Sequence, residues 1–440
     1  MSLLKNAEWA DKATLASHQQ TLWEKQSTYV AERSVFYQKL WQGTRPPQTL
    51  SDLAALPLSD KSQLRLSQAK HGPFGSYLAA DPSEVNRLHR TSGTTGQAMN
   101  LALSARDCHI TAVVGGRSHR AAGLKASDKV VHCLNYQMWM GGVSDHLTLE
   151  QTGAMVVPFG VGSSELLIRT IQEIGINAIS CTPSYPSVLE RVLESHFPNI
   201  DPKDLGLRLG LFGGEAGLDD PAFRQRLKDV WGMEPRNANY GVSDVFSNFA
   251  SQCEHDTHLH FLGSDILYPE LIDPDNGQVL DMQDGQIGEL VLTHLAKDCQ
   301  PLVRFRTGDI LQIVASDPCS CGRTGMRFKV IGRSDDMVVV RGLNVFPTQI
   351  AAILGSMPQL SGDYRIILDG HPPYDRLPVH AEVAKQQGIS DALAREVEAL
   401  IKKRLGVTAE VTLRLFASFP TTEGKTRRVL HSAKDGVGHV

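Results

Sequence analysis

The sequence has no long apolar run, no surplus of one charge and little cysteine. None of its apolar stretches reaches the roughly 18 residues that a helix needs to cross a bilayer, so we expect no membrane-spanning segment. The 44 Lys and Arg residues nearly balance the 48 Asp and Glu residues, giving a net charge of -4. This balance gives neither nucleic acid nor an anionic membrane surface an electrostatic reason to be the main partner.

The seven cysteines are too few and too irregularly spaced for a disulfide framework, which is typical of small secreted domains. The N-terminus also lacks the cationic segment followed by an apolar run that a secretory signal requires. We therefore expect a cytoplasmic protein with reduced thiols, some of them available to a metal.

What is present is the composition of a globular protein, with 41% hydrophobic and 21% charged residues. Short apolar runs such as 130–134 and 178–181 alternate with stretches of helical spacing such as 164–174. This alternation predicts an α/β fold in which parallel or mixed sheets are joined by crossover helices. From about residue 260 to 330, short strands between Gly, Asp and Pro turns predict a β-rich subdomain, which could form a small barrel. Strand and helix signals recombine after residue 332 and predict a small α+β domain.

A hexapeptide rich in glycine and hydroxyl groups is the first candidate ligand loop; it consists of Thr91, Ser92, Gly93, Thr94, Thr95 and Gly96. Glycines let the backbone approach a ligand closely, and hydroxyl and amide groups donate to phosphate oxygens. The loop is not a Walker A motif, because no Gly-Lys-Ser/Thr follows it. Alone, it is equally consistent with a polar turn.

Four further motifs follow this loop: Tyr240-Gly-Val-Ser-Asp244, Arg304-Phe-Arg-Thr-Gly-Asp309, Gly332-Arg-Ser-Asp-Asp-Met337 and Gly424-Lys425. In this order the motifs resemble those of the adenylate-forming superfamily of acyl-CoA synthetases, adenylation domains and luciferases. The stretch from Gly332 to Pro347 most resembles the phenylacetate-CoA ligase branch. The resemblance spans roughly residues 90–425.

The resemblance implies an ATP-dependent acid–CoA ligase that works in two half-reactions. A carboxylate first displaces pyrophosphate from ATP to form an acyl-AMP, and the thiol of CoA then releases AMP. It also implies a large adenylation domain over 1–332, a hinge at 333–336 and a mobile C-terminal lid over 337–440, because one pocket has to serve two reactions. A homodimer is expected from the resemblance alone.

The resemblance also assigns residues to the nucleotide. The 91–96 loop is expected to hold the β- and γ-phosphates. Asp244 is the expected Mg²⁺ ligand, although the family usually has Glu there, one methylene longer. Asp309 is expected to accept hydrogen bonds from the ribose hydroxyls. Adenine is expected to lie between two short segments, formed by Tyr240 with Gly241 and by Gly214 with Glu215.

Three further roles fall near the C-terminal domain. Arg333 is expected to contact the nucleotide, and Asp335 falls at the hinge position. Lys425 is the residue that we expect to bridge the incoming carboxylate and the α-phosphate, stabilising charge at the transferring phosphorus. Alone, the basic run that follows Lys425 would be interpreted as a solvated surface.

A separate group of cysteine and histidine residues indicates a structural zinc site. Cys253, Cys319 and Cys321 can supply three thiolates, and an imidazole would complete a closed tetrahedral site. Among the three nearby histidines we choose His260, with His258 second. Some ligases of the phenylacetate branch resemble this pattern and carry zinc; the alternative is free cysteines in surface loops.

The acid pocket is expected in residues 135–142, which follow a predicted strand. Tyr136 and Trp139 would form a partly aromatic slot, and Gly141 would leave room for a ring. This favours an aromatic acid, of the phenylacetate, indoleacetate, benzoate or anthranilate type. No acidic residue within this stretch is placed to meet an amine of the substrate, which disfavours amino acids. The alternative is that these side chains belong to the core.

Two other functions remain open at this point. The acceptor could be a carrier-protein thiol instead of CoA, or the chain could be a nucleotide-binding regulator that has lost its chemistry. The presence of Lys425, Asp309 and Asp244 argues against the regulator.

Overall fold

The structure is a computed structural model that describes residues 3–91, 98–215, 217–370, 374–419 and 427–432. It divides into two compact units. The first combines Met1–Gly214 with Val230–Val330, and the second combines Glu215–Asp229 with Ile331–Val440.

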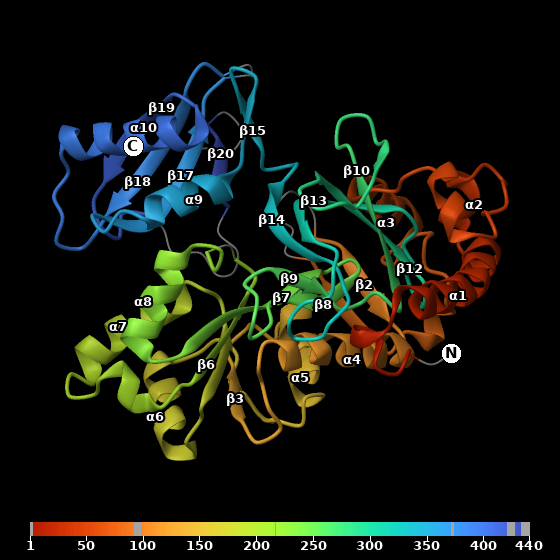
Figure 1. Cartoon of the computed structure of the whole chain (residues 1–440), viewed down its shortest axis with the longest axis horizontal. Coiled ribbons are helices and arrows are strands. Elements are labelled where there is room, and N and C mark those ends of the chain that lie inside the picture. Colours follow the sequence, from red (N-terminus) through yellow and green to blue (C-terminus); the bar gives the residue numbers. More distant parts are fainter. Residues whose placement is uncertain (1–2, 92–97, 216, 371–373, 420–426, 433–440) are drawn as a thin grey trace. The chain divides into compact units, whose positions relative to one another are not determined.

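A mixed sheet of twelve strands forms the centre of the first unit (Figure 1). In spatial order the strands are β11 (Val279–Leu280), β10 (Leu267–Ile272), β12 (Ile287–His294), β13 (Phe305–Ala315), β14 (Arg327–Arg333), β9 (Leu259–Phe261), β8 (Phe246–Ser251), β7 (Glu234–Val242), β6 (Leu209–Gly213), β5 (Ala178–Cys181), β3 (Lys129–His132) and β4 (Met155–Pro158). The five strands from β7 to β4 are parallel, and β8 pairs antiparallel with β7. The sheet therefore changes from parallel to antiparallel at β7.

Helices cover this sheet and join its parallel strands. Those that lie wholly in the first unit are α1 (Lys12–Arg33), α2 (Val35–Leu40), α3 (Lys61–His71), α4 (Ala105–Ala121), α5 (Met140–Glu150), α6 (Ser164–Ile174) and α7 (Tyr185–His196), while α8 (Pro221–Trp231) begins in the second unit. Helices α4 and α5 pack on each other and on β8. Their starts are placed by local chemistry; the Ser104 hydroxyl, for example, accepts from the Asp107 backbone N–H as the N-cap of α4.

The N-terminal helices are fixed to the far end of the same unit. Trp23 and Tyr37 are fully buried in one apolar cluster with residues of β8, β13 and β14, including Phe246 and Phe328. The side-chain amide of Gln26 donates to the Lys297 carbonyl at 2.8 Å. The first forty residues therefore depend on partners about 270 positions later in the chain.

The second unit is a small α+β domain. Its four-stranded sheet has the order β19 (Ala409–Arg414), β18 (Leu377–Val383), β17 (Leu360–Leu368) and β20 (Val429–His431). A hairpin of β15 (Val338–Val340) and β16 (Leu343–Val345) precedes helix α9 (Pro347–Gly355), and α10 (Asp391–Leu405) packs on β19. Ile350, Ile366 and Val397 are fully buried in the core between these elements.

The structure confirms the predicted α/β fold with a smaller C-terminal α+β domain. One expectation is wrong: the strands between residues 260 and 330 do not close into a separate barrel. They extend the large sheet instead, because β9 pairs with both β8 and β14 and connects the two regions. Among the described residues, no helix combines the length and apolar character needed to cross a membrane.

Candidate functional site

Two of the predicted nucleotide residues lie together where the sheet changes direction. The Tyr240 hydroxyl, on β7, donates to Asp309 Oδ2, on β13, at 2.7 Å. The Tyr240 ring forms T-shaped contacts with the rings of Phe249 and Phe328, which fix its position. The Asp309 backbone N–H donates to the Thr307 hydroxyl, and its side chain is largely buried. The Tyr240 and Asp309 motifs therefore meet in space although 69 residues separate them.

The glycines of these motifs are required by close backbone approaches. A Cβ at Gly241 would lie 1.9 Å from the Ser247 carbonyl oxygen, so no other residue fits between β7 and β8 at this point. Gly214 has a φ of +82°, in the left-handed region that glycine tolerates best. Both positions therefore fix the backbone beside Tyr240 and at the end of β6.

Other predicted nucleotide residues belong to the second unit or are not described. Glu215 falls in the second unit. In that unit the Arg333 guanidinium binds Asp335 through contacts of 2.8 and 3.1 Å, so the hinge residue is held by its neighbour two positions away. Ser92, Gly93, Thr94, Thr95, Gly96 and Lys425 lie outside the described residues.

A β-hairpin flanks the loop that is predicted to hold the phosphates. The hairpin of β1 (Arg87–Arg90) and β2 (Asn100–Leu103) leads into and out of the loop. Thr91 is buried, and its hydroxyl accepts from the Met99 backbone N–H at 3.0 Å. The loop therefore begins and ends on a closed hairpin.

Asp244, the predicted Mg²⁺ ligand, already has one cationic partner. Its Oδ2 binds the ammonium of Lys61 at 2.8 Å, at the start of α3. Its Oδ1 is buried and has no hydrogen-bond partner in the described part of the chain. One hard oxygen thus remains free for a cation. Sequence reasoning missed Lys61, because 183 positions separate the two residues.

The predicted acid segment lies beside Arg90, at the start of the predicted phosphate loop. The Arg90 backbone N–H, the last of β1, donates to the Met138 carbonyl at 2.8 Å, and Arg90 also forms a parallel bridge with Trp139. Tyr136 and Trp139 are half-buried, so neither is an ordinary core residue. The helix α5 begins directly after Trp139.

Two buried histidines hold this segment through hydrogen bonds to its backbone carbonyls. His132 Nε2 lies 2.9 Å from the Gly141 carbonyl, and His132 Nδ1 lies 3.1 Å from the Ser180 hydroxyl. In the neutral tautomer that satisfies both contacts, Nε2–H donates to Gly141 and Nδ1 accepts from Ser180. His89 similarly contacts the Met138 carbonyl through Nδ1 and the Ser144 hydroxyl through Nε2.

The burial of His132 predicts that the folded protein loses stability in acid. Burial lowers the pKa of His132 to about 4, below its usual 6.5, so the folded protein resists protonation there. The unfolded chain binds that proton first, and the stabilisation present above pH 6.5 is lost as the pH falls towards 4. For His132 this amounts to about 3 kcal/mol of unfolding free energy.

The measurement is urea unfolding between pH 7.5 and 4.5 for the wild type and for His132→Phe. We expect the variant to lose less stability on acidification, by up to that amount. The control is the exposed His71→Phe, which should follow the wild type. Parallel curves for His132→Phe and the wild type would contradict the assignment.

A buried carboxyl next to the acid segment was missed by sequence reasoning. Asp145, on α5, is 2% exposed, and its Oδ2 accepts from the side-chain amide of Asn239 at 2.5 Å. It lies three residues beyond the stretch in which no acidic group was expected. In a sequence, an acidic residue on a helix usually indicates a solvent-facing position, so no local signal marked it.

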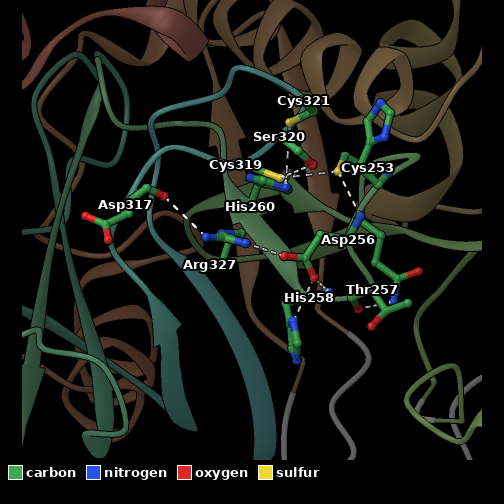
Figure 2. Close-up of polar contacts among 12 residues, drawn as sticks. Cys253, Asp256, Thr257, His258, His260, Asp317, Cys319, Ser320, Cys321 and Arg327 are labelled. Atoms are coloured by element: carbon green, nitrogen blue, oxygen red, sulfur yellow. Dashed lines mark hydrogen bonds and ion pairs between the residues drawn. The ribbon is translucent and has the colours of Figure 1, made fainter.

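The four predicted zinc ligands come together at the edge of β9. Figure 2 shows the side chains of Cys253, His260, Cys319 and Cys321 directed at one another. Their ligand atoms all lie within 4.8 Å of each other. Cys253 Sγ is 3.9 Å from Cys319 Sγ, close to the roughly 3.8 Å between two sulfurs of a tetrahedral zinc site with Zn–S bonds near 2.3 Å. The donor set and spacing therefore fit zinc.

The surrounding residues decide between the two candidate histidines. His260 Nε2 lies 4.0 Å from Cys321 Sγ, whereas His258 Nδ1 is turned to Asp256 at 2.7 Å (Figure 2). Asp256 also binds Arg327. Burial raises the pKa of the Cys253 thiol to about 12, so a bound cation would be needed to keep its thiolate at neutral pH.

The N-terminal turn is attached to this cluster. Arg323, two residues after Cys321, binds the Glu8 carboxylate at 3.0 Å. The Thr324 backbone N–H donates to the Glu8 carbonyl, also at 3.0 Å. The loop of cysteines is thus packed against the start of the chain.

Known proteins are similar to this chain in sequence and in fold. A sequence profile described as "AMP-binding enzyme" matches residues 31–294, and one described as "AMP-binding enzyme C-terminal domain" matches residues 342–432. The phenylacetate-coenzyme A ligase of Thermus thermophilus is 33% identical over 430 residues, which cover 92% of this chain and 94% of the relative. That of Pseudomonas putida is 35% identical, with 86% and 84% covered.

A solved structure extends the similarity to the fold of both domains. The crystal structure of 2-hydroxyisobutyryl-CoA ligase in the postadenylation state, in complex with R3-HIB-AMP, has a TM-score of 0.87 at 27% identity. It covers 97% of this chain and 91% of that one. These findings confirm the resemblance seen in the motifs. The chain therefore belongs to the AMP-binding, adenylate-forming enzyme family and, within it, to the phenylacetate-CoA ligase branch of the AMP-forming acid–CoA ligases.

Proposed function

We propose that this acid–CoA ligase activates an aromatic carboxylic acid, of the aryl or arylacetic type. The observation that carries the proposal is the bridge between Arg90 and Trp139, which sets the aromatic acid segment against the start of the predicted phosphate loop. An acid bound there would have its carboxylate near the nucleotide. The relatives named phenylacetate-coenzyme A ligases support an aromatic substrate.

The first half-reaction would use the residues around Tyr240. Asp309, fixed by the Tyr240 hydroxyl, would accept from the ribose hydroxyls. Tyr240 and Gly241, with Gly214 and Glu215, would flank the adenine. Lys425 and Arg333 would contribute positive charge from the C-terminal domain, where charge develops on the transferring phosphoryl group.

The same half-reaction is expected to need Mg²⁺, which would neutralise phosphate charge when it is bound. Asp244 would hold it through the oxygen that Lys61 leaves unpaired. In the second half-reaction the CoA thiol attacks the acyl carbon and releases AMP. Asp335 would act as the hinge that lets the lid present a different face to each step.

Zinc would have a structural role. Cys253, His260, Cys319 and Cys321 would fill all four positions of a tetrahedral zinc site, which would leave no open position for substrate. A bound zinc would join the loop at residues 319–321 to β9. We also propose that the enzyme is cytoplasmic and forms a homodimer. The few, irregularly spaced cysteines support the location, and the resemblance supports the homodimer.

The test is acid-dependent exchange between ATP and labelled pyrophosphate, measured with aryl, arylacetic, short aliphatic, hydroxylated and amino acids. We expect strong exchange with at least one aromatic acid and, on adding CoA, equal amounts of AMP and thioester. If pyrophosphate exchange occurs but CoA gives no AMP or thioester, the acceptor is a carrier-protein thiol instead of CoA. Exchange confined to short aliphatic acids would contradict the aromatic pocket.

A further inference from the structure

The acid segment and the nucleotide motifs meet at one buried polar pair, Asp145 and Asn239. Asp145 lies on α5, one helical turn after Gly141, and a Cβ at Gly141 would stand 3.5 Å from Asp145 Oδ2. Asn239 precedes Tyr240 on β7, and its Cβ would lie only 2.5 Å from a Cβ at Gly213. The pair therefore connects the acid segment with the backbone that flanks the expected adenine site.

This carboxyl has hydrogen-bonding capacity that the protein leaves unused. Asn239 occupies Oδ2, whereas Asp145 Oδ1 is buried and has no hydrogen-bond partner among the residues that the structure describes. The Ser247 hydroxyl is nearby, but it also lacks a bond of normal geometry. A buried acceptor without a donor costs stability, and such groups are usually retained for a reason.

Among the residues that the structure describes, no cation compensates for the burial of Asp145. Burial raises the pKa of Asp145 to about 7, and only the neutral groups of Asn239 and Ser247 act in the opposite direction. A buried ion pair elsewhere in the unit shows the contrast: Asp265 is held by two guanidinium contacts from Arg117. Asp145 thus has the environment of a carboxyl whose second hydrogen bond would come from a bound ligand.

We propose that Asp145 and Asn239 form a polar wall of the acid pocket and select acids that carry a hydroxyl or amino group. This inference rests on the proposed function and narrows its substrate class. The substituent would donate to Asp145, with Asn239 holding the carboxyl in place. Gly141 has no side chain and lies beside this carboxyl, with Oδ2 as its nearest carboxyl atom, so the acid segment leaves space next to Asp145. An acid without such a donor would leave the buried carboxyl unpaired. A binding site rejects an analogue that lacks a hydrogen-bonding group more strongly than one that lacks a methylene.

The test compares acids that differ by one donor. The pairs are phenylacetate against 2-hydroxy-2-phenylacetate, and benzoate against 2-hydroxybenzoate and 2-aminobenzoate. The readout is kcat/KM for pyrophosphate exchange. In the wild type we expect at least one donor-bearing acid to exceed its parent by about 10- to 100-fold, the range for a hydrogen bond to a charged group.

The decisive variant is Asp145→Asn, which keeps the shape of the side chain. Its carbonyl can still accept from Asn239, but the atom facing the substrate becomes an NH₂ donor. We expect the preference to fall to near unity, through loss on the donor-bearing acid. Asp128→Asn is the matched control, because it converts another buried carboxyl, which is paired with Arg208 directly before β3, and should keep the wild-type preference.

The outcomes separate this inference from the proposed function. Exchange with no acid at all would reject the proposed function itself. Exchange in which parent acids perform as well as their donor-bearing partners would reject the polar wall while leaving the aromatic acid ligase standing. An Asp145→Asn variant that loses activity equally on both members of a pair would show that the residue only supports the fold; thermal unfolding and ATP binding of the same preparation check its integrity.

Discussion

Replacement of Lys425 by alanine should lower pyrophosphate exchange by about a thousandfold and leave thiolysis of a supplied acyl-adenylate within a few-fold of the wild type. The reason is that the two half-reactions develop charge at different atoms. Negative charge gathers on the α-phosphate only while the carboxylate displaces pyrophosphate, and an ammonium placed there stabilises that transition state alone. In thiolysis the bond broken is between the acyl carbon and the AMP oxygen.

Both half-reactions can be measured on the same preparation, by exchange and by CoA-dependent release of AMP from synthetic acyl-AMP. Lys403→Ala, on the exposed face of α10, removes an ammonium from the same domain and should leave both rates unchanged. Equal losses in the two half-reactions of Lys425→Ala would assign the residue to nucleotide binding in general. The prediction depends on the motif, since Lys425 lies outside the described residues.

Loss of one cysteine from the metal cluster should have the largest effect on stability. Protein purified without chelator should contain about one equivalent of zinc, and Cys319→Ser should contain almost none. Because a bound zinc would join β9 to a loop sixty residues later, its loss would leave buried thiols and His260 without a common partner. We expect the thermal midpoint to fall by about 10 °C.

The control for this experiment is Cys108→Ser, which removes another buried thiol, on α4, and should keep the zinc content of the wild type. Chelation of the wild type should reproduce the lowered midpoint of Cys319→Ser and add nothing to the variant itself. A full equivalent of zinc in Cys319→Ser, or wild-type protein that contains none, would contradict the site.

Local periodicity was enough to predict several elements closely. The apolar run at 178–181 is β5, and the helical spacing at 164–174 is α6, because each pattern matches the burial of its own element. Which strands pair with one another was harder to predict. The pairing of β9 with β14 joins Leu259 to Phe328, and no local pattern specifies contacts over such a distance, so the antiparallel strands were expected in a separate subdomain.

In the candidate site too, residues marked by a local motif could be predicted, and residues defined by distant partners could not. Asp309 and Tyr240 could be chosen because family motifs mark them, and the cysteines because their chemistry is distinctive. Asp145 and Lys61 carry no such mark, since an acidic or basic residue on a helix is ordinary. Their importance arises only from what the folded chain places beside them: Asn239 in one case and Asp244 in the other.

The packing of the first helices against the end of the large unit has a consequence for biosynthesis. Trp23 and the helix that carries it emerge from the ribosome first, but Lys297, which receives the amide of Gln26, is made about 270 residues later. At roughly 5–20 residues per second, the buried face of this helix, with Trp23 and Val30, waits between about 15 seconds and a minute for its binding surface. During that interval the apolar face of the helix lacks its partners, and the translation speed of residues 27–297 sets how long it stays exposed.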